Sequence, residues 1–266
     1  MNRTLRRRQL LAFVLPLLVA TVGCDIVTAD FRSEETSEWR RSYQLGPNGK
    51  VEVTNVNGKI EVGPASGNTV EVVARKKARG ASPEAAKSAL ERITISENAS
   101  PDSVRIDTKL ERGGGIFNGG QLQVEYHVKV PAGAEVKFTT TNGGIELAGL
   151  NGRITAETTN GGVHAREVAG QIDASTTNGG LDIDLAKVPE GGVKLGCTNG
   201  GIKLRLPRDG KATISARITN GGISAEDLAI ETTGERNRRR LDGRLNGGGA
   251  RIDIEGTNGG ITLTGR

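Results

Sequence analysis

Hydrophobic and polar residues alternate along much of the chain after residue 49, and one short motif interrupts the alternation again and again. The motif is Thr-Asn-Gly-Gly, and it occurs at 141–144, 159–162, 177–180, 198–201, 219–222 and 257–260. Apolar residues stand at every second position on both sides of each copy. Period-two alternation around a turn predicts two β-strands per repeat. Asn-Gly favours a tight turn because both residues tolerate a positive φ.

The spacing of the motif indicates a repeat architecture. The asparagines of successive copies are 18, 18, 21, 21 and 38 residues apart, and the last spacing is close to two periods. Asn246-Gly247-Gly248 lies inside this long gap, and we interpret it as a degenerate copy. Thr54-Asn55-Val56-Asn57-Gly58 is an earlier relative of the motif. Self-similarity at a period of about 20 residues is typical of proteins built from stacked units.

Two architectures fit this repetition. In a β-solenoid or β-roll-like stack, equivalent residues lie about 4.7 Å apart and the asparagine side chains form an amide ladder. In an antiparallel β-sandwich or meander, each Asn-Gly-Gly is a hairpin tip. We favour the stack, because the motif keeps the same place in every repeat. The predicted fold class is therefore mainly β, a repeat-built solenoid with one short capping α-helix.

The chain divides into segments of different pattern. Residues 1–23 form a predicted signal peptide, and residues 24–48 are polar and read as a lipid-proximal tether. Residues 49–130 form an N-terminal β region with a helix at about 82–93, and residues 131–266 form the repeat region. Ser82 is the expected N-cap of the helix, with Pro83 at its first position. We expect this helix to cover an open edge of the stack.

The N-terminus predicts export. Arg3, Arg6, Arg7 and Arg8 precede an apolar run from Leu10 to Val22, which is too short to span a membrane comfortably. Thr21-Val22-Gly23-Cys24 resembles a bacterial lipobox, which implies that Cys24 is lipidated after cleavage. An ordinary signal peptide with an incidental cysteine is the alternative. Arg7-Arg8-Gln9-Leu10-Leu11 also resembles a twin-arginine signal, so the export route stays open.

The charge of the chain gives no support for nucleic-acid binding. The whole chain carries a formal charge of +5, and four of these charges are the arginines of residues 1–23, so the remainder carries +1. The basic character is therefore concentrated in the predicted signal peptide.

Several segments together resemble the DUF4097 family of β-strand-repeat proteins, which are often labelled adhesins. These are Thr54 to Val62, the central helix, Val130-Pro131-Ala132-Gly133-Ala134 and the Thr-Asn-Gly-Gly-Ile copies. The resemblance covers roughly residues 49–266. It implies an exported, often membrane-attached β-repeat protein, and it implies no catalytic residues.

Candidate chemistry is sparse. The chain has two histidines and two cysteines. His127 and His164 fall at solvent-facing positions of predicted strands, and we interpret both as surface residues. The cysteines and histidines lie far apart in sequence, so we expect no metal, no cofactor and no catalytic residue. Cys197 is expected to be a small buried residue.

Two pairs of acids, Asp182 with Asp184 and Asp253 with Glu255, stand at i and i+2 on one strand face. Paired carboxylates can hydrolyse glycosidic bonds. Outward acids are also ordinary solubilising residues, and we prefer that interpretation.

One local basic cluster interrupts the repeat where a rung is expected. It contains Arg236, Arg238, Arg239, Arg240, Arg244 and Arg251. We interpret it as a solvated loop or an irregular rung. The alternative is a contact with anionic lipid, lipopolysaccharide or acidic glycan.

The threonine pairs that precede several Asn-Gly-Gly copies could form a flat threonine array. Cys197-Thr198 and Ile218-Thr219 break the Thr-Thr pattern, which argues against it.

These features predict an exported, lipid-anchored protein of the cell envelope that presents a β-repeat surface for binding or adhesion and is not an enzyme. Its expected partners are the membrane, through the lipid anchor, and an envelope glycan or protein. Two alternatives stay open. One is a glycan-active enzyme on a β-helix, which requires acids with Lys or Arg on one face of adjacent rungs. The other is an accessory protein of an envelope-stress signalling system.

Overall fold

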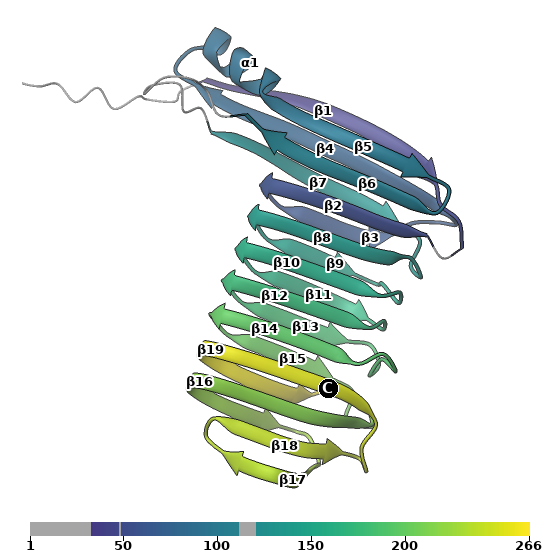
Figure 1. The fold of residues 1–266 in the computed structure, drawn as a ribbon, viewed down its shortest axis with the longest axis vertical. Coiled ribbons are helices and arrows are strands. Elements are labelled where there is room, and N and C mark those ends of the chain that lie inside the picture. The colour runs from purple at the N-terminus through teal and green to yellow at the C-terminus, as the bar shows by residue number, and fades with distance from the viewer. Residues whose placement is uncertain (1–32, 48, 112–120) are drawn as a thin grey trace, which may run out of the picture. The chain divides into compact units, whose positions relative to one another are not determined.

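The computed structural model describes residues 33–47, 49–111 and 121–266 (Figure 1). In these ranges the chain forms nineteen β-strands and one α-helix, which confirms the mainly-β class. The predicted signal peptide, residues 1–23, and the predicted lipidation site, Cys24, lie outside the described residues.

The first part of the described chain contains seven strands and the helix. Their bounds are β1 Ser33–Gln44, β2 Lys50–Asn57, β3 Ile60–Pro64, β4 Thr69–Gly80, α1 Pro83–Glu91, β5 Ile93–Ser100, β6 Ser103–Leu110 and β7 Leu122–Val130. The second part contains twelve strands. Their bounds are β8 Glu135–Asn142, β9 Ile145–Ala148, β10 Ile154–Asn160, β11 Val163–Val168, β12 Ile172–Asn178, β13 Leu181–Leu185, β14 Val193–Asn199, β15 Ile202–Leu206, β16 Ala212–Glu226, β17 Ile230–Asn237, β18 Arg240–Leu245 and β19 Ala250–Gly265.

The repeats stack in parallel and in register. Ile154 of β10, for example, pairs with Val136 of β8 on one side and Ile172 of β12 on the other. Strands that precede a corner form one face of the stack, here called the first-strand face, and strands that follow a corner form the second-strand face (Figure 1). Parallel pairing confirms the solenoid-like stack and makes the antiparallel sandwich or meander wrong for the repeats, because hairpin tips join antiparallel strands.

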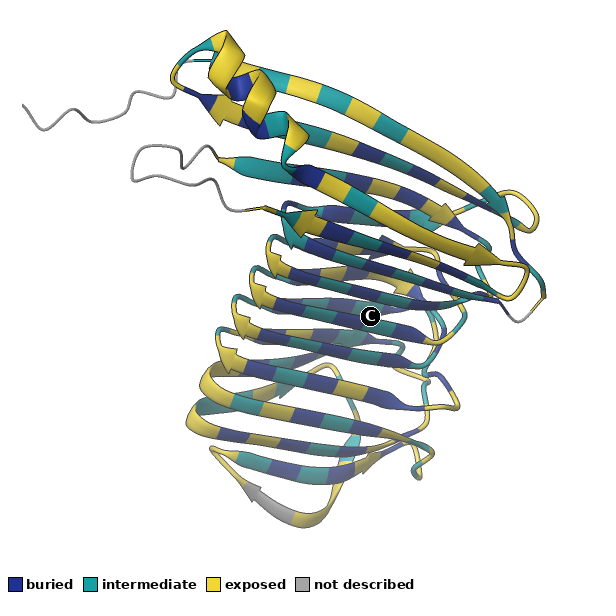
Figure 2. Cartoon of the chain, turned by 45° about the horizontal axis from the view of Figure 1, so that its top comes forward, coloured by how far each residue is buried: buried dark blue, intermediate teal, exposed yellow. Residues whose placement is uncertain are grey.

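The core lies between the two faces and is built from small and branched apolar side chains. Buried and exposed residues alternate along nearly every strand of the stack, so each strand sends one side inward and one outward (Figure 2). Val, Ile, Leu and Ala dominate the interior, with Phe138 and Tyr126 as its largest members. Burial of this apolar surface is the main favourable term for such a narrow body.

The predicted asparagine ladder is present along the corner of the stack. Six side-chain amides each donate to the side-chain oxygen of the asparagine before them in the row, at 2.7 to 2.9 Å. The order in space is Asn57, Asn142, Asn160, Asn178, Asn199, Asn258 and Asn220. A row of polarised hydrogen bonds fixes the corner of one rung above that of the next.

A second column of hydrogen bonds runs just inside the ladder. The hydroxyl of Thr158 donates to the Gly143 carbonyl at 2.9 Å, and the hydroxyl of Thr176 donates to the Gly161 carbonyl at 2.8 Å. Cys197 takes the same place in its rung, is 5% exposed, and has its sulfur 3.4 Å from the Gly179 carbonyl oxygen. Burial raises the pKa of this thiol. The prediction of a small buried cysteine is confirmed.

The C-terminal strand enters the stack out of sequence order. β19 pairs in parallel with β14 and β15 on one side and with β16 on the other, so it lies between rungs that follow one another along the chain. The spacing of 38 residues is therefore not two successive periods. Asn246-Gly247-Gly248 is not a degenerate rung corner either, because it joins β18 to β19 and Asn246 donates to the carbonyls of Arg208 and Gly210.

The helix covers the N-terminal end of the stack. The prediction of a helix at about 82–93 is confirmed, with slightly narrower bounds of Pro83–Glu91. The hydroxyl of Ser82 accepts the Ala85 amide at 3.2 Å as an N-cap, and Ala86 and Ala89 are buried. A side chain at Gly80 of β4 would meet the Ala86 backbone nitrogen at 2.5 Å, so the helix lies directly on this strand.

Two sequence interpretations need correction. Residues 24–48 are not a tether throughout, because 33–44 form β1, which pairs antiparallel with β4 over twelve residues. The arginine cluster is an irregular part of the sheet and not a loop, because β17, β18 and β19 carry four of its members. β17 and β18 form an antiparallel hairpin against β16. Both segments cover edges of the stack that would otherwise be open to pairing.

The close approach at each corner leads to a stability prediction. A Cβ at Gly200, whose φ is +148°, would stand 1.5 Å from the Gly179 carbonyl oxygen. We expect Gly200→Ala to lower the free energy of unfolding by about 2–4 kcal/mol, because the side chain is both strained and overlapped. Urea unfolding of the purified protein measures this change.

The matched control is the neighbouring glycine. A Cβ at Gly201 would come no closer than 3.7 Å, to the Gly260 carbonyl oxygen, and its φ is not positive. Gly201→Ala should therefore change the unfolding midpoint little. Equal effects of the two substitutions would contradict the stacking constraint.

Candidate functional site

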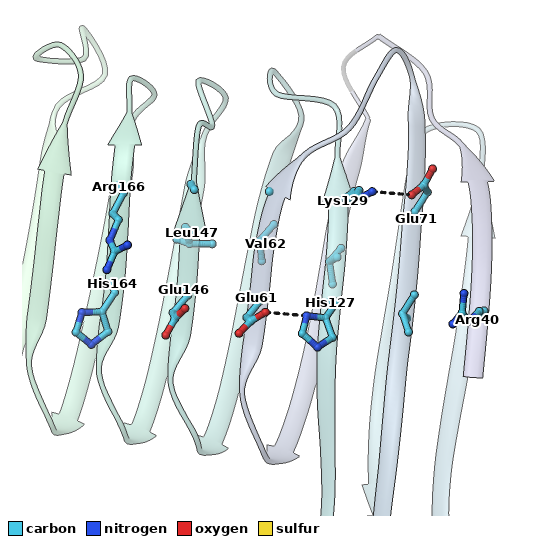
Figure 3. Close-up of a pocket in the computed structure, with 14 residues that line it drawn as sticks. Arg40, Glu61, Val62, Glu71, His127, Lys129, Glu146, Leu147, His164 and Arg166 are labelled. Atoms are coloured by element: carbon cyan, nitrogen blue, oxygen red, sulfur yellow. Dashed lines mark ion pairs between the residues drawn. The ribbon is translucent and has the colours of Figure 1, made fainter. Parts of the chain in front are cut away.

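A hollow of about 570 Å³ lies on the outer side of the second-strand face, near its N-terminal end (Figure 3). Strands β1, β4, β7, β3, β9 and β11 contribute to it. Its polar lining residues are Arg40, Glu61, Glu71, His127, Lys129, Glu146, His164 and Arg166. The floor is low because Gly63 and Ala148 stand where longer side chains would fill the space, and a Cβ at Gly63 would meet no atom within 4 Å.

Both histidines of the chain line this hollow. In register across four strands stand His127 of β7, Glu61 of β3, Glu146 of β9 and His164 of β11. Neighbouring strands lie about 4.8 Å apart, so each imidazole stands beside a carboxylate. Figure 3 shows the four side chains in this row.

Hydrogen-bonded ion pairs join the middle of the row. Nδ1 of His127 lies 2.7 Å from Oε2 of Glu61. Nζ of Lys59 lies 2.5 Å from Oε1 of Glu61 and 2.8 Å from Oε1 of Glu146. The hydrogen bond from Lys59, aided by the charge of Lys59 and by His127, lowers the pKa of Glu61 below its ordinary value despite some desolvation. A second pair, Lys129 with Glu71 at 3.5 Å, lies farther along the hollow.

The prediction that His127 and His164 are surface residues is confirmed, since both are exposed. The sequence analysis missed that they share a site. The sequence could have predicted part of this row from a constant spacing. Three of its residues each stand four positions after a ladder asparagine: Glu61 after Asn57, Glu146 after Asn142 and His164 after Asn160. His127 lies outside the repeat and has no such offset.

We expected no metal site because the histidines lie far apart in sequence, but the fold brings His127 and His164 into the same hollow. Nevertheless, no three His, Cys, Asp or Glu side chains among the described residues converge as metal ligands. Three of the four acids singled out in the sequence contact arginines instead. Arg205 contacts Asp182 and Arg251 contacts Asp253, each at 2.6 Å, and Arg266 lies 3.3 Å from Asp184.

The threonines before the asparagines form a more regular column than the sequence indicated. The residue directly before each ladder asparagine is exposed in all six copies: Thr141, Thr159, Thr177, Thr198, Thr257 and Thr219. Cys197 and Ile218 replace threonine only in the buried column, so they do not interrupt the exposed one.

Within the part of the chain that the structure describes, none of the helices has the length and apolar character needed to cross a membrane.

Comparison with known proteins identifies the fold. A model of the Toastrack DUF4097 family matches residues 50–264. A candidate cell adhesion protein from Clostridium sporogenes shares 13% identity, with a TM-score of 0.50, covering 87% of this chain and all of the other. A candidate adhesin from Bacteroides fragilis shares 10% identity, covering 86% of this chain and 97% of the other. Its TM-score of 0.24 is too low to support a common fold.

The curated proteins contain no match to this chain. At 13% identity the Clostridium structure supports a common fold and nothing finer. The family match spans most of the chain and includes the corners, the helix and the intercalated C-terminal strand. The protein therefore belongs to the Toastrack DUF4097 family.

Proposed function

We propose that this protein is exported, anchored to the cell envelope through a lipid on Cys24, and displays its β-repeat body as a non-catalytic binding surface. The charged head, apolar core and Gly23-Cys24 of residues 1–24 support export and lipidation. The candidate cell adhesion protein of similar fold agrees with a binding role, without adding detail to it.

The observation that carries the proposal is the asparagine ladder with the exposed faces beside it. Seven linked amides hold the corner of the stack, so the side chains on both faces keep fixed spacings. The hollow of Figure 3 and the threonine column lie on these faces, open to solvent. Rigid elements that present polar groups at fixed spacing suit recognition, because little conformational entropy is lost on binding.

The short stretch of chain between Cys24 and the first strand also suits display at the membrane surface. β1 begins at Ser33, nine residues after Cys24, and nine extended residues span at most about 30 Å. A lipid on Cys24 would therefore keep the folded body close to the membrane.

The anchor is tested by Cys24→Ala in a bacterial host with labelled palmitate. We expect label and membrane fractionation for the wild type, and soluble or unprocessed protein without label for the variant. Cys197→Ala is the matched control, since this buried cysteine should have no effect on either readout. Absence of label from the wild type would refute the anchor.

A glycan-active enzyme is the second candidate, because the cluster it requires is present. Glu61 and Glu146 stand on adjacent rungs with Lys59 between their carboxylates. Glycoside hydrolysis needs one carboxyl that keeps its proton near neutral pH. Lys59 lowers the pKa of Glu61, which is the wrong direction for that role, so we favour binding.

The two candidates differ in the release of reducing sugar from envelope polysaccharide. We expect the wild type to release none above background and Glu146→Gln to behave identically. Turnover by the wild type that is lost in both Glu61→Gln and Glu146→Gln would establish the enzyme instead.

The role of Lys59 predicts a pKa change. In Lys59→Met we expect the pKa of Glu61 to rise toward its ordinary value, as followed by carboxyl NMR. Because its pKa is lowered in the folded state, the Glu61 carboxylate contributes stability above its ordinary pKa, and this contribution is lost as the pH falls through the folded pKa. Lys59→Met should therefore lower the free energy of unfolding at neutral pH, and this effect should fade as the pH falls through the folded pKa of Glu61. Lys50→Met, which removes a pair with Glu135 at 3.4 Å, is the control and should leave Glu61 unchanged.

A further inference from the structure

A second depression lies on the first-strand face, across the outer surface of β12, β14, β19 and β16. It consists of two hollows, of about 550 and 190 Å³, which share Gly196, Arg217 and Glu255. The larger one runs along the stack, bounded on one side by exposed threonines and on the other by Ser175, Gly196, Glu255 and Arg217. It is separate from the hollow of Figure 3, which lies on the second-strand face.

The depression exists because one position on the face lacks a side chain. In register across the four strands stand Ser175, Gly196, Glu255 and Arg217. A Cβ at Gly196 would have only one neighbour within 4 Å, the Ser175 Cβ at 3.8 Å. No described side chain occupies the gap, and the position could carry a larger residue without a clash.

The first wall of the depression is a row of hydroxyl groups. Thr177, Thr198, Thr257 and Thr219 are exposed, and none of their hydroxyls has a hydrogen-bond partner among the described residues. They recur at the strand spacing of about 4.8 Å, so the four span about 14 Å along the stack. Each hydroxyl can donate one hydrogen bond and accept two. A regular row of this length fits an extended polymer better than a compact small molecule.

The opposite wall supplies charge. Arg217 is exposed and forms no salt bridge with any described residue, although Glu255 stands opposite it in register. On its other side Arg217 pairs in register with Arg240, whose guanidinium lies 2.6 Å from Asp242. Like charges on opposed positions of neighbouring strands are unfavourable, but Asp242 offsets this repulsion. Its hydrogen bonds with Ser215 and Arg240, together with the charges of Arg240 and Arg217, lower the pKa of Asp242. The guanidinium of Arg217 can still bind a carboxylate through two parallel hydrogen bonds.

The smaller hollow extends the cationic side. It adds Lys194 and Arg251 to Arg217, against Asp253 and Glu255. Arg251 already binds Asp253 at 2.6 Å, and Lys194 lies 3.8 Å from Asp173. Two of the three cations of this lining are thus paired, and Arg217 is the one that forms no salt bridge with a described residue. We therefore expect an acidic group of a ligand to bind at Arg217.

From these observations we infer that the depression is the binding site for a linear acidic polysaccharide lying along the stack. Sugar hydroxyls bond to the threonine row, a sugar carboxylate bonds to Arg217, and the chain passes over Gly196. The inference rests on the proposed function as a binding protein and specifies its ligand and site.

The test is a titration of the full-length protein in detergent with polygalacturonate oligomers, by isothermal calorimetry, with dextran of similar length as the neutral probe. We expect binding of the acidic polymer, weaker at high salt, and no comparable binding of dextran. Gly196→Val should weaken binding about tenfold or more, because the new side chain rises from the floor of the site. Arg217→Gln should also weaken it and reduce its salt dependence.

Thr139→Val is the matched control. Thr139 of β8 is an outward residue of the same first-strand face, in the register row of Ser175 and Gly196, but it lines neither hollow. Valine suits a strand at either position, so both variants should keep the wild-type unfolding midpoint. The site is supported if Gly196→Val loses binding and Thr139→Val keeps it.

Three results would overturn the inference. Loss of binding with Gly63→Val, which fills the hollow of Figure 3, and not with Gly196→Val would move the site to the opposite face. Binding to anionic vesicles through Arg217, without binding to the polymer, would make the ligand a lipid surface. Failure to bind any polymer would refute the glycan site. It would not affect the proposed lipid anchor, which the Cys24→Ala experiment tests independently.

Discussion

The stack depends on one close contact, between the first glycine of each corner and the carbonyl oxygen of the same glycine in the preceding rung. An added Cβ would stand 2.0 Å from that oxygen at Gly161 and Gly179, and 1.5 Å at Gly200. Only glycine allows backbones to approach so closely at a positive φ. Once the rungs are this close, the preceding asparagine lies within hydrogen-bond distance of its counterpart, and the inner threonine or cysteine reaches the glycine carbonyl.

This contact also determines how the outer faces are composed. Because every rung is aligned at its corner, residues at equal distance from the asparagine form columns along the stack. Glu61, Glu146 and His164 share one such column, and Thr177 and Thr198 share another. A single substitution therefore changes a position in a column without moving the backbone. The same scaffold can present an ion-paired row on one face and a hydroxyl-lined depression on the other.

The two ends of the stack need a different kind of stabilisation, because a repeat always leaves an unpaired strand edge at each end. At the N-terminal end, α1 and β1 lie against β4, and Arg41 stacks on Trp39 with its guanidinium 4.9 Å from the ring centre. Tyr43 there hydrogen-bonds Glu97 of β5, and partial burial together with that carboxylate raises the pKa of Tyr43. At the other end, β17 shifts register against β18 between Thr232 and Arg236. An irregular, charged last strand is a poor template for further pairing.

The sequence by itself determined the features that are local and repeated. The corner motif, the two strands around it, the amide ladder and the capped helix all follow from short-range preferences and from a period visible in one dimension. Only the tertiary structure decided where β19 inserts, that 33–44 pairs with β4, and that His127 stands beside Glu61. Each of these depends on which strands meet across a long stretch of chain. Asn199 could stack on Asn220 or on Asn258 with the same local chemistry, and the choice between them is made by the packing of the whole stack.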